Sequence, residues 1–196
     1  GHGIRLVYCH SPAHWLYQRD RYLGDRGRLD FARLGLAALG PLLRRWDRRA
    51  AGRADRYLVN STIVRDRVQA AYGIEATVVP PPLFLDPDAT QEPVAALADW
   101  ADGYHLVVSR LLPYKNVEAA VAAFAGMPSR RLVVVGEGPG AARLAAQLPS
   151  NVRLVRDLDD AGLRWTYAHC LMLVAPSFED FGLTPLEAGA FGKPTV

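Results

Sequence analysis

Six residues that could bind a ligand lie after apolar runs in the second half of the chain: Arg110, Lys115, Gly136, Gly138, Glu179 and Glu187. The arginine and the lysine, beside exposed backbone N–H groups, are suited to an anion such as a phosphate or diphosphate. The two glutamates are suited to hydroxyl groups, such as those of a ribose or a sugar, because an ionised carboxylate only accepts hydrogen bonds. Together these residue types predict a ligand that carries both phosphates and hydroxyls.

Each of these residues also has a purely structural explanation. Thr184 and Glu187 have the spacing of a capping box, with Pro185 at the first helical position. A Gly-x-Gly pair can be no more than a tight turn, and a single arginine or lysine is most often a solvated surface charge. His10 and His14 are four residues apart, but a proline between them spoils a helical metal pair. We therefore expect no metal site.

A regular alternation of strands and helices would bring the six residues to one edge of a sheet. From residue 104 onward the pattern predicts strands at 104–109, 131–136, 152–155 and 171–175, and helices at 116–126, 139–147, 159–169 and 185–191. Continuous apolar strands that alternate with helices are typical of a parallel sheet covered on both faces. Ligands bind outside the carboxyl ends of such strands. We therefore predict an α/β, doubly wound fold with the six residues at that edge.

The first half of the chain shows the same alternation less regularly. Its predicted elements are strands at 4–9, 56–60 and 76–79 and a helix at 62–72. Ser61 or Thr62 is expected to cap this helix, and Gly73 to close it. In the arginine-rich segment after the first strand, the spacing predicts two helices, the second beginning at Pro41. An apolar stretch at 194–196 predicts one more strand, so we expect the chain to be a fragment.

Prolines at positions 80–82, 87 and 93 indicate a boundary between two domains. We predict that residues 1–85 belong to a first domain, that 86–103 form an interdomain linker, and that 104–196 form a second domain.

Composition narrows the class of protein further. Half of the 196 residues are apolar and 22% are charged, which favours a packed core over disorder. No apolar run approaches the roughly 20 residues that span a bilayer. Cys9 and Cys170 lie far apart, each beside an apolar run, and are expected to be reduced, buried thiols of a cytosolic protein.

The positive charge is concentrated at the start of the chain. Residues 1–56 contain 12 arginines and 5 aspartates, a net charge of +7, whereas residues 57–196 have a net charge of −4. A basic segment indicates an anionic neighbour such as a membrane surface, a phosphorylated substrate or a nucleic acid. The alternative is that the arginines only solvate helix faces. The interleaved aromatic residues typical of nucleic-acid binding are lacking, so we expect no nucleic-acid partner.

Short motifs spread along the chain resemble those of one enzyme family, in the same order. In the first half they are Tyr8-Cys-His10-Ser-Pro12, Asn60-Ser61 and Val79-Pro-Pro-Pro82. In the second half they are Val108-Ser-Arg-Leu-Leu-Pro-Tyr-Lys-Asn116, Val135-Gly-Glu-Gly-Pro139 and Glu179-Asp-Phe-Gly-Leu-Thr-Pro-Leu-Glu187, with Gly192-Lys-Pro-Thr-Val196 at the end. The chain resembles the retaining GT-B glycosyltransferases of family 4, also called group 1. The first motif and the one that contains Arg110 are similar to the mannosyltransferase-like branch that builds bacterial surface polysaccharides.

The resemblance implies an α/β fold of the GT-B type, with two Rossmann-like, doubly wound parallel-sheet domains, both incomplete in this chain. Residues 1–85 would then be part of the acceptor domain and residues 104–196 part of the nucleotide-sugar donor domain. Because half of the cleft wall would be missing, the chain by itself is expected to be inactive.

Roles for individual residues follow from the same resemblance. Arg110 and Lys115 would hold the donor diphosphate and neutralise the leaving group. Glu179 would bind hydroxyls of the transferred sugar, and Glu187 those of the ribose. His10 would face the cleft and contact the transferred sugar or the acceptor. Contacts with the donor are also implied for Gly136, Gly138, Phe181, Gly182 and Leu183.

The activity implied is transfer of a hexosyl group, with mannosyl as one candidate, from a nucleoside-diphosphate sugar such as GDP-mannose. The acceptor would be a saccharide or a lipid-linked saccharide in surface polysaccharide synthesis, and the reaction would retain anomeric configuration without a metal. The basic stretch 19–56, between Arg19 and Arg56, would contact anionic lipids at the inner face of the cytoplasmic membrane. The alternative is a non-catalytic nucleotide-binding α/β module that serves a complex.

Overall fold

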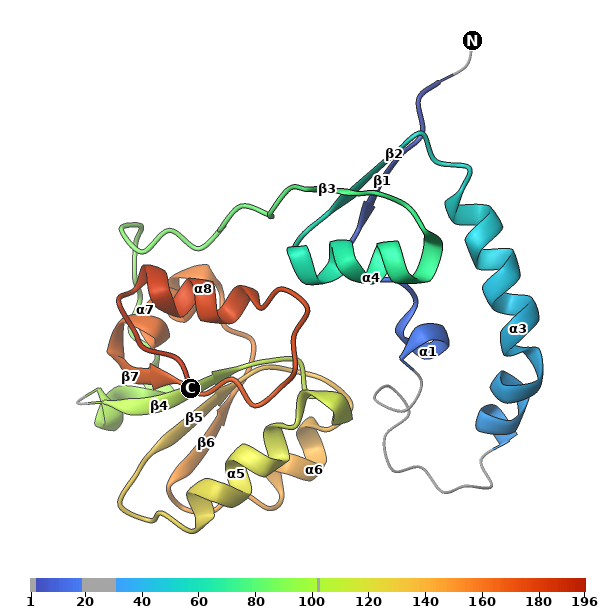
Figure 1. The fold of residues 1–196 in the computed structure, drawn as a ribbon. Helices are drawn as coiled ribbons and strands as arrows, with labels where there is room; N and C mark the ends of the chain where they lie inside the picture. The colour runs from blue at the N-terminus through green and yellow to red at the C-terminus, as the bar shows by residue number, and fades with distance from the viewer. Residues whose placement is uncertain (1–2, 19–30, 102) are drawn as a thin grey trace. The chain divides into compact units, whose positions relative to one another are not determined.

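The computed structural model describes residues 3–18, 31–101 and 103–196, with the backbone alone for 31–34 and 37. The chain divides into two compact units, Gly1–Pro82 and Leu83–Val196 (Figure 1). Each unit contains its own parallel sheet.

The second unit is built on a four-stranded parallel sheet in the order β6-β5-β4-β7. Its strands are β4 (Tyr104–Val108), β5 (Leu132–Val135), β6 (Val152–Val155) and β7 (Cys170–Leu173). Beyond β7, Thr195 forms a parallel bridge with Leu173, where the sequence predicts a further strand. Because β5 and β6 extend to one side of β4 while β7 lies on the other, the strand order reverses between β4 and β7. In sheets of this kind, ligands bind outside the carboxyl ends of the strands at the point where the order reverses.

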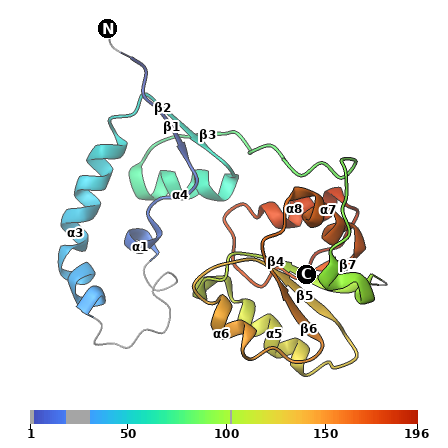
Figure 2. The ribbon, with the colours of Figure 1, turned by 180° about the vertical axis from the view of Figure 1, so that it is seen from behind.

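Helices cover both faces of this sheet (Figure 2). The helices of this unit are η1 (Ala95–Trp100), η2 (Pro113–Lys115), α5 (Val117–Ala125), α6 (Ala141–Ala145), α7 (Asp160–His169) and α8 (Leu183–Ala190). One buried cluster joins α5 and α6 to one face of the sheet, and the other joins η1, α7 and α8 to the opposite face. Alternate residues supply the two faces: Val133 belongs to one cluster and Val134 to the other, and all four residues of β5 are buried. The predicted α/β fold with a doubly wound parallel sheet is confirmed for this unit.

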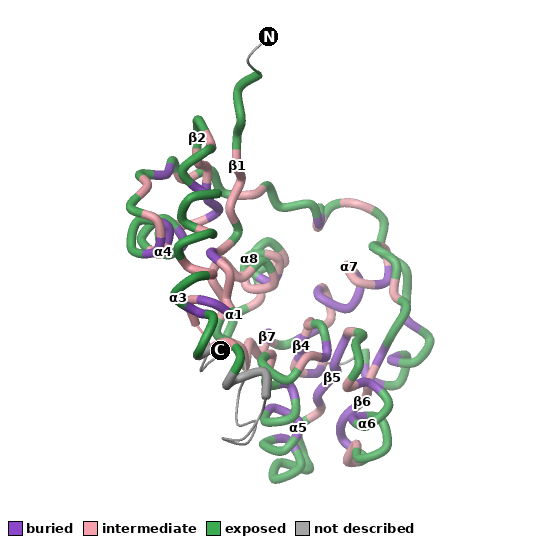
Figure 3. Tube along the Cα trace, turned by 90° about the vertical axis from the view of Figure 1, so that its right-hand side faces the viewer, coloured by how far each residue is buried: buried purple, intermediate pink, exposed green. Residues whose placement is uncertain are grey.

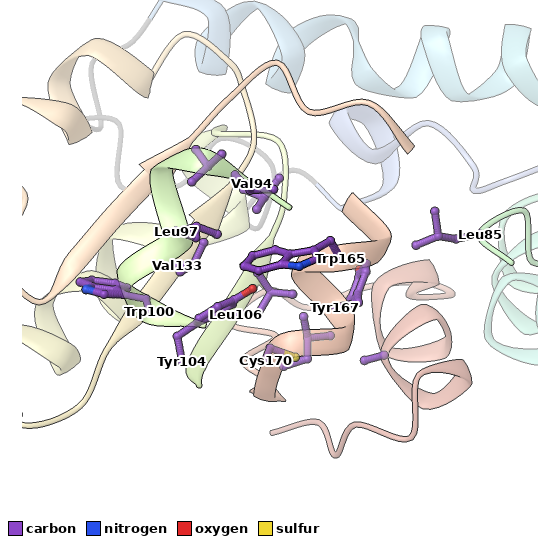
Figure 4. Close-up of a cluster of buried hydrophobic side chains, with 14 residues drawn as sticks. Leu85, Val94, Leu97, Trp100, Tyr104, Leu106, Val133, Trp165, Tyr167 and Cys170 are labelled. Atoms are coloured by element: carbon purple, nitrogen blue, oxygen red, sulfur yellow. The ribbon is translucent and has the colours of Figure 1, made fainter. Parts of the chain in front are cut away.

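The segment 86–103, expected to be an interdomain linker, packs as part of the second unit. Val94, Leu97 and Trp100 are buried in the cluster that also holds α7 and α8 (Figure 4). Arg153 of β6 lies over the Trp100 ring, 4.0 Å from its centroid, and pairs with Asp99. The prolines therefore mark a change of direction in the chain, and apolar residues between and after them anchor η1 to the sheet.

The first unit contains the three-stranded parallel sheet β1-β2-β3 and three described helices. The strands are β1 (Leu6–Cys9), β2 (Arg56–Val59) and β3 (Thr77–Val78), and the helices are α1 (His14–Tyr17), α3 (Phe31–Ala51) and α4 (Thr62–Tyr72). Both predicted ends of α4 are confirmed. The Ser61 side chain accepts a hydrogen bond from the Val64 N–H, and Gly73 takes the left-handed conformation with φ of 69°.

One continuous helix, α3, replaces the two helices predicted around Pro41. The prediction fails because Pro41 lies on the exposed side of the helix, where the carbonyl that loses its N–H partner can be hydrated. Figure 3 shows α3 largely exposed, in contrast to the buried strands β4 and β5. Among the described residues, no helix combines the length and the apolar character that crossing a bilayer requires.

Candidate functional site

Three loops of the second unit meet at the carboxyl edge of its sheet, and we call residues 109–116, 136–140 and 174–182 the rim. The first loop follows β4, the second β5 and the third β7. The Asn116 side-chain amide donates to the Pro176 carbonyl at 3.4 Å, which ties the first loop to the third. Every residue predicted in the second half to bind a ligand lies on the rim or in α8, the helix that follows it.

An ion pair joins Lys115 to Glu179 across the rim. The Ser177 hydroxyl donates to the same oxygen of Glu179 at 2.6 Å. The side chains of Lys115 and Glu179 are 17% and 33% exposed, so both charges are partly shielded from water yet reachable by a ligand. The cation assigned to the diphosphate and the carboxylate assigned to the sugar are therefore direct neighbours, which spacing in the sequence does not reveal.

The loop that carries Arg110 rests on the two glycines of the second loop. A Cβ on Gly136 would lie 1.9 Å from the Ser109 carbonyl oxygen, and one on Gly138 would lie 2.8 Å from the Leu111 carbonyl oxygen. Backbone hydrogen bonds reinforce this contact: the Leu111 N–H donates to the Glu137 carbonyl at 2.6 Å. The two glycines therefore form a tight turn, which is the structural alternative considered for Gly136 and Gly138. This turn supports the loop that carries the exposed Arg110.

Glu187 is held by a residue that the sequence analysis missed. The Tyr167 hydroxyl on α7 donates to Glu187 Oε2 at 2.6 Å, and Tyr167 is fully buried. Burial, reinforced by the Glu187 carboxylate, raises the pKa of Tyr167 well above its usual range, so the hydroxyl keeps its proton. The capping box, the structural alternative for Glu187, does not form, because α8 begins at Leu183 and places Thr184 inside the helix. In the sequence, only the place of Tyr167 among the apolar residues of the predicted helix at 159–169 points to its role.

The remaining predicted donor contacts lie at the start of α8. Gly182 precedes the helix with φ of 75° and, having no side chain, cannot itself cap the first turn. Phe181 is half-buried and the Leu183 side chain is exposed. N–H groups at the start of a helix are able to bind an anion. His10 belongs to the first unit, where it is exposed at the carboxyl end of β1 with its ring edge-to-face to Tyr8 at 5.0 Å. Its role stays a prediction.

Within residues 3–18, 31–101 and 103–196, no three His, Cys, Asp or Glu side chains gather as a metal site would require. Neither cysteine forms a disulfide: Cys9 is half-buried and Cys170 is buried. Burial raises the pKa of the Cys170 thiol to about 11, so it is protonated at neutral pH.

The sequence matches a known family, and the fold matches solved structures. Residues 95–196 match the model of the family described as glycosyl transferases group 1. No curated protein matches the sequence. Among solved structures, the chain is similar to sucrose-phosphate synthase from Thermosynechococcus elongatus, with 23% identity and a TM-score of 0.70 over 97% of this chain and 49% of that one.

Two further structures are similar over part of the chain. The pneumococcal O-GlcNAc transferase GtfA in complex with UDP and GlcNAc has 19% identity and a TM-score of 0.53, over 76% of this chain and 31% of that one. AviGT4, a glycosyltransferase involved in avilamycin A biosynthesis, has 23% identity and a TM-score of 0.51, over 71% and 42%. The chain thus spans half or less of the length of these proteins, and at such identities the likeness shows the fold.

Proposed function

Because the chain belongs to the group 1 glycosyl transferases, we propose that it is part of an enzyme that moves a hexosyl group from a nucleoside-diphosphate sugar to an acceptor hydroxyl. The observation that supports this proposal is the ion pair of Lys115 and Glu179 on the rim, with Arg110 on the same loop as Lys115 and Glu187 in the helix that follows the rim. Two cations, two carboxylates and the start of a helix thus lie on the rim or directly after it. The chemistry of these groups matches a ligand with a diphosphate flanked by a sugar and a ribose.

Each side chain has a distinct task in this reaction. Arg110 and Lys115 bind the diphosphate and stabilise the negative charge that grows on it as the glycosidic bond breaks. Glu179 accepts hydrogen bonds from the transferred sugar, which fixes the sugar relative to the diphosphate. Glu187 accepts a hydrogen bond from a ribose hydroxyl. The N–H groups at the start of α8 receive a phosphate oxygen, with Gly182 leaving room for its approach.

The finer assignments rest on the resemblance of the motifs. We propose transfer with retention of configuration and without a metal, from a donor for which GDP-mannose is the first candidate. The proposed acceptor is a saccharide or a lipid-linked saccharide of surface polysaccharide synthesis. His10, from the first unit, would contact the transferred sugar or the acceptor.

The direct test is calorimetric titration of the protein with GDP, UDP, ADP and dTDP, followed by assays of hydrolysis and transfer with the matching sugar nucleotides. We expect one nucleoside diphosphate to bind best and Arg110→Ala to weaken it about tenfold or more, since a charge-assisted hydrogen bond is lost. Arg130→Ala is the matched control, because Arg130 is an exposed arginine of the same unit, before β5 at the opposite edge of the sheet.

Three outcomes separate the alternatives. Binding that needs Arg110 but not Arg130, together with sugar transfer, supports the enzyme. Nucleotide binding without turnover of any sugar nucleotide would instead identify a binding module. No binding of any nucleoside diphosphate would contradict both.

For the location of the enzyme, we propose that α3 lies on an anionic membrane surface at the inner face of the cytoplasmic membrane. Leu39, Leu42 and Trp46 are 54%, 66% and 67% exposed, and their spacing places them on one side of the helix. An open depression along the same helix is lined by Pro41 and four arginines: Arg44, Arg45, Arg48 and Arg49. Apolar side chains flanked by arginines are typical of helices that lie in a lipid interface, and the charge favours anionic lipids.

Sedimentation with lipid vesicles tests this location. We expect binding to phosphatidylcholine vesicles only when they contain phosphatidylglycerol, and we expect binding to weaken as salt is added. Trp46→Gln and Arg45→Gln should each reduce it about fivefold. Ile63→Gln serves as control, because Ile63 is 47% exposed on α4. Binding that ignores salt and lipid charge, or equal effects of all three substitutions, would refute the proposal.

A further inference from the structure

Tyr167 occupies an unusual position for a polar side chain. It is fully buried in the cluster between the sheet and helices α7 and α8 (Figure 4). Its ring stacks on Phe191 with centroids 5.5 Å apart and planes 15° from parallel. The hydroxyl at the end of this ring donates to Glu187 Oε2 at 2.6 Å. Packing on all sides therefore fixes where the hydroxyl points, and with it where one oxygen of Glu187 lies.

The bond to Glu187 is strong for two physical reasons. A hydroxyl buried in an apolar core must find a partner, and a bond to an ionised carboxylate is shorter and stronger than a neutral one. The raised pKa of Tyr167 keeps the proton on its oxygen, so the direction of donation is fixed. The second oxygen, Oε1, has no hydrogen bond to any residue that the structure describes. Glu187 is half-buried, so Oε1 is left for a ligand.

We propose that Tyr167 is a positioning residue for ribose recognition, which holds Glu187 so that its free oxygen is set for a ribose hydroxyl before the nucleotide arrives. This inference rests on the proposed function, because it assigns Glu187 to the ribose. A free glutamate side chain would have to give up its rotamer freedom when the nucleotide binds. With Tyr167 in place that freedom is already lost in the folded protein, and affinity for the ribose rises accordingly.

The test compares two ligands and two tyrosines. The ligands are the nucleoside diphosphate that binds best and its 2′,3′-dideoxy analogue, which lacks the ribose hydroxyls. The variants are Tyr167→Phe and Tyr104→Phe. Tyr104 is also fully buried in the same cluster, and its hydroxyl donates to the Thr166 carbonyl at 2.8 Å. Both substitutions therefore remove one hydrogen bond from a buried tyrosine, but only the first involves Glu187.

We expect the wild-type protein to prefer the ribose form and Tyr167→Phe to weaken its binding about tenfold. Binding of the dideoxy analogue should not change. In the Glu187→Gln background, Tyr167→Phe should have a much smaller effect. Tyr104→Phe should lower the melting temperature while leaving the preference for ribose intact. Phe191→Leu, which keeps the hydroxyl but removes the stacked ring, should reduce the preference by a smaller factor.

The outcomes distinguish this inference from the proposed function. If Glu187→Gln abolishes a wild-type preference for ribose while Tyr167→Phe and Phe191→Leu both retain it, the inference is wrong and the proposed function stands. Equal weakening of both ligands by Tyr167→Phe also refutes it, because that result describes general damage to the core. If the wild-type protein binds both ligands equally, or binds neither, the ribose contact of the proposed function fails as well.

Discussion

Substitution of Gly136 by alanine tests whether the glycine turn supports the loop of Arg110. The added Cβ would lie 1.9 Å from the Ser109 carbonyl oxygen, far inside van der Waals contact, and φ at this position is 156°. The obstacle is backbone on both sides, so no side chain can rotate away. One of the two loops must move.

The cost of that movement can be assembled from the contacts it breaks. Overpacking against a fixed backbone costs about 1–3 kcal/mol. Two hydrogen bonds lie beside the clash, Ser109 N–H to Val135 O at 3.0 Å and Leu111 N–H to Glu137 O at 2.6 Å, and each contributes about 1 kcal/mol. We therefore expect a loss of about 3–5 kcal/mol in the free energy of unfolding. Out of the roughly 5–15 kcal/mol typical of a folded protein, this is a large share.

Urea denaturation followed by circular dichroism measures the loss, and calorimetry below the transition measures nucleotide affinity. Gly189→Ala is the matched control, because Gly189 lies in α8 and an added Cβ there meets nothing within 4 Å. Alanine in a helix is favoured over glycine, so this control should be neutral or more stable by up to about 1 kcal/mol. A Gly136→Ala protein as stable as wild type, with unchanged nucleotide affinity, would refute the supporting role of the turn.

Three further predictions concern the framework of the protein. Asn151→Ala should lower the free energy of unfolding, measured in urea, by about 2–3 kcal/mol. The reason is that the Asn151 amide donates to three carbonyls, those of residues 124, 127 and 130, at 2.7–3.1 Å. Asn151→Asp should be destabilised as well, because its carboxylate has no N–H to donate. The Arg153 guanidinium lowers the pKa of Asp99 from 3.8 to about 2, so this pair stabilises the fold above about pH 4 and stops doing so as the pH falls towards 2. In Asp99→Asn, the free energy of unfolding should therefore depend less on pH between about 4 and 2. An unchanged pH dependence would contradict the assignment. Burial raises the pKa of both thiols, and Cys170 is the more buried. Iodoacetamide at pH 8 should therefore alkylate Cys9 before Cys170 in the native protein, as followed by mass spectrometry. The reverse order would be inconsistent with the packing.

The strands of the second unit were predictable because local pattern and tertiary environment agree. A run such as Leu132-Val-Val-Val135 is β-branched and apolar throughout, which suits a strand covered on both faces, and the structure buries all four residues. The ends of α4 were predictable for a related reason, since Ser61 and Gly73 each satisfy orphan backbone groups through their own chemistry.

Three features of the structure could not be predicted because they depend on the tertiary surroundings of a residue, which the local sequence does not show. Glu187 fits a capping box by spacing, but Tyr167, 20 residues earlier, offers its carboxylate a buried hydroxyl instead. Pro41 breaks a local rule for helices, yet its exposure makes the lost hydrogen bond inexpensive. Proline content at 86–103 gives no sign that Leu97 and Trp100 are buried, because their burial depends on an apolar surface assembled from strands further along the chain.

The ion pair between Lys115 and Glu179 has a consequence for the ligands that the proposed site would select. With the lysine already neutralised by the glutamate, a free phosphate gains little by entering, because it would leave the carboxylate without its cation. A molecule that brings both an anionic group for the lysine and hydroxyls for the glutamate satisfies both partners at once. If the proposed function holds, the rim would thus discriminate among phosphates: cellular phosphate and plain polyphosphates meet one condition, and a sugar joined to a phosphate meets both.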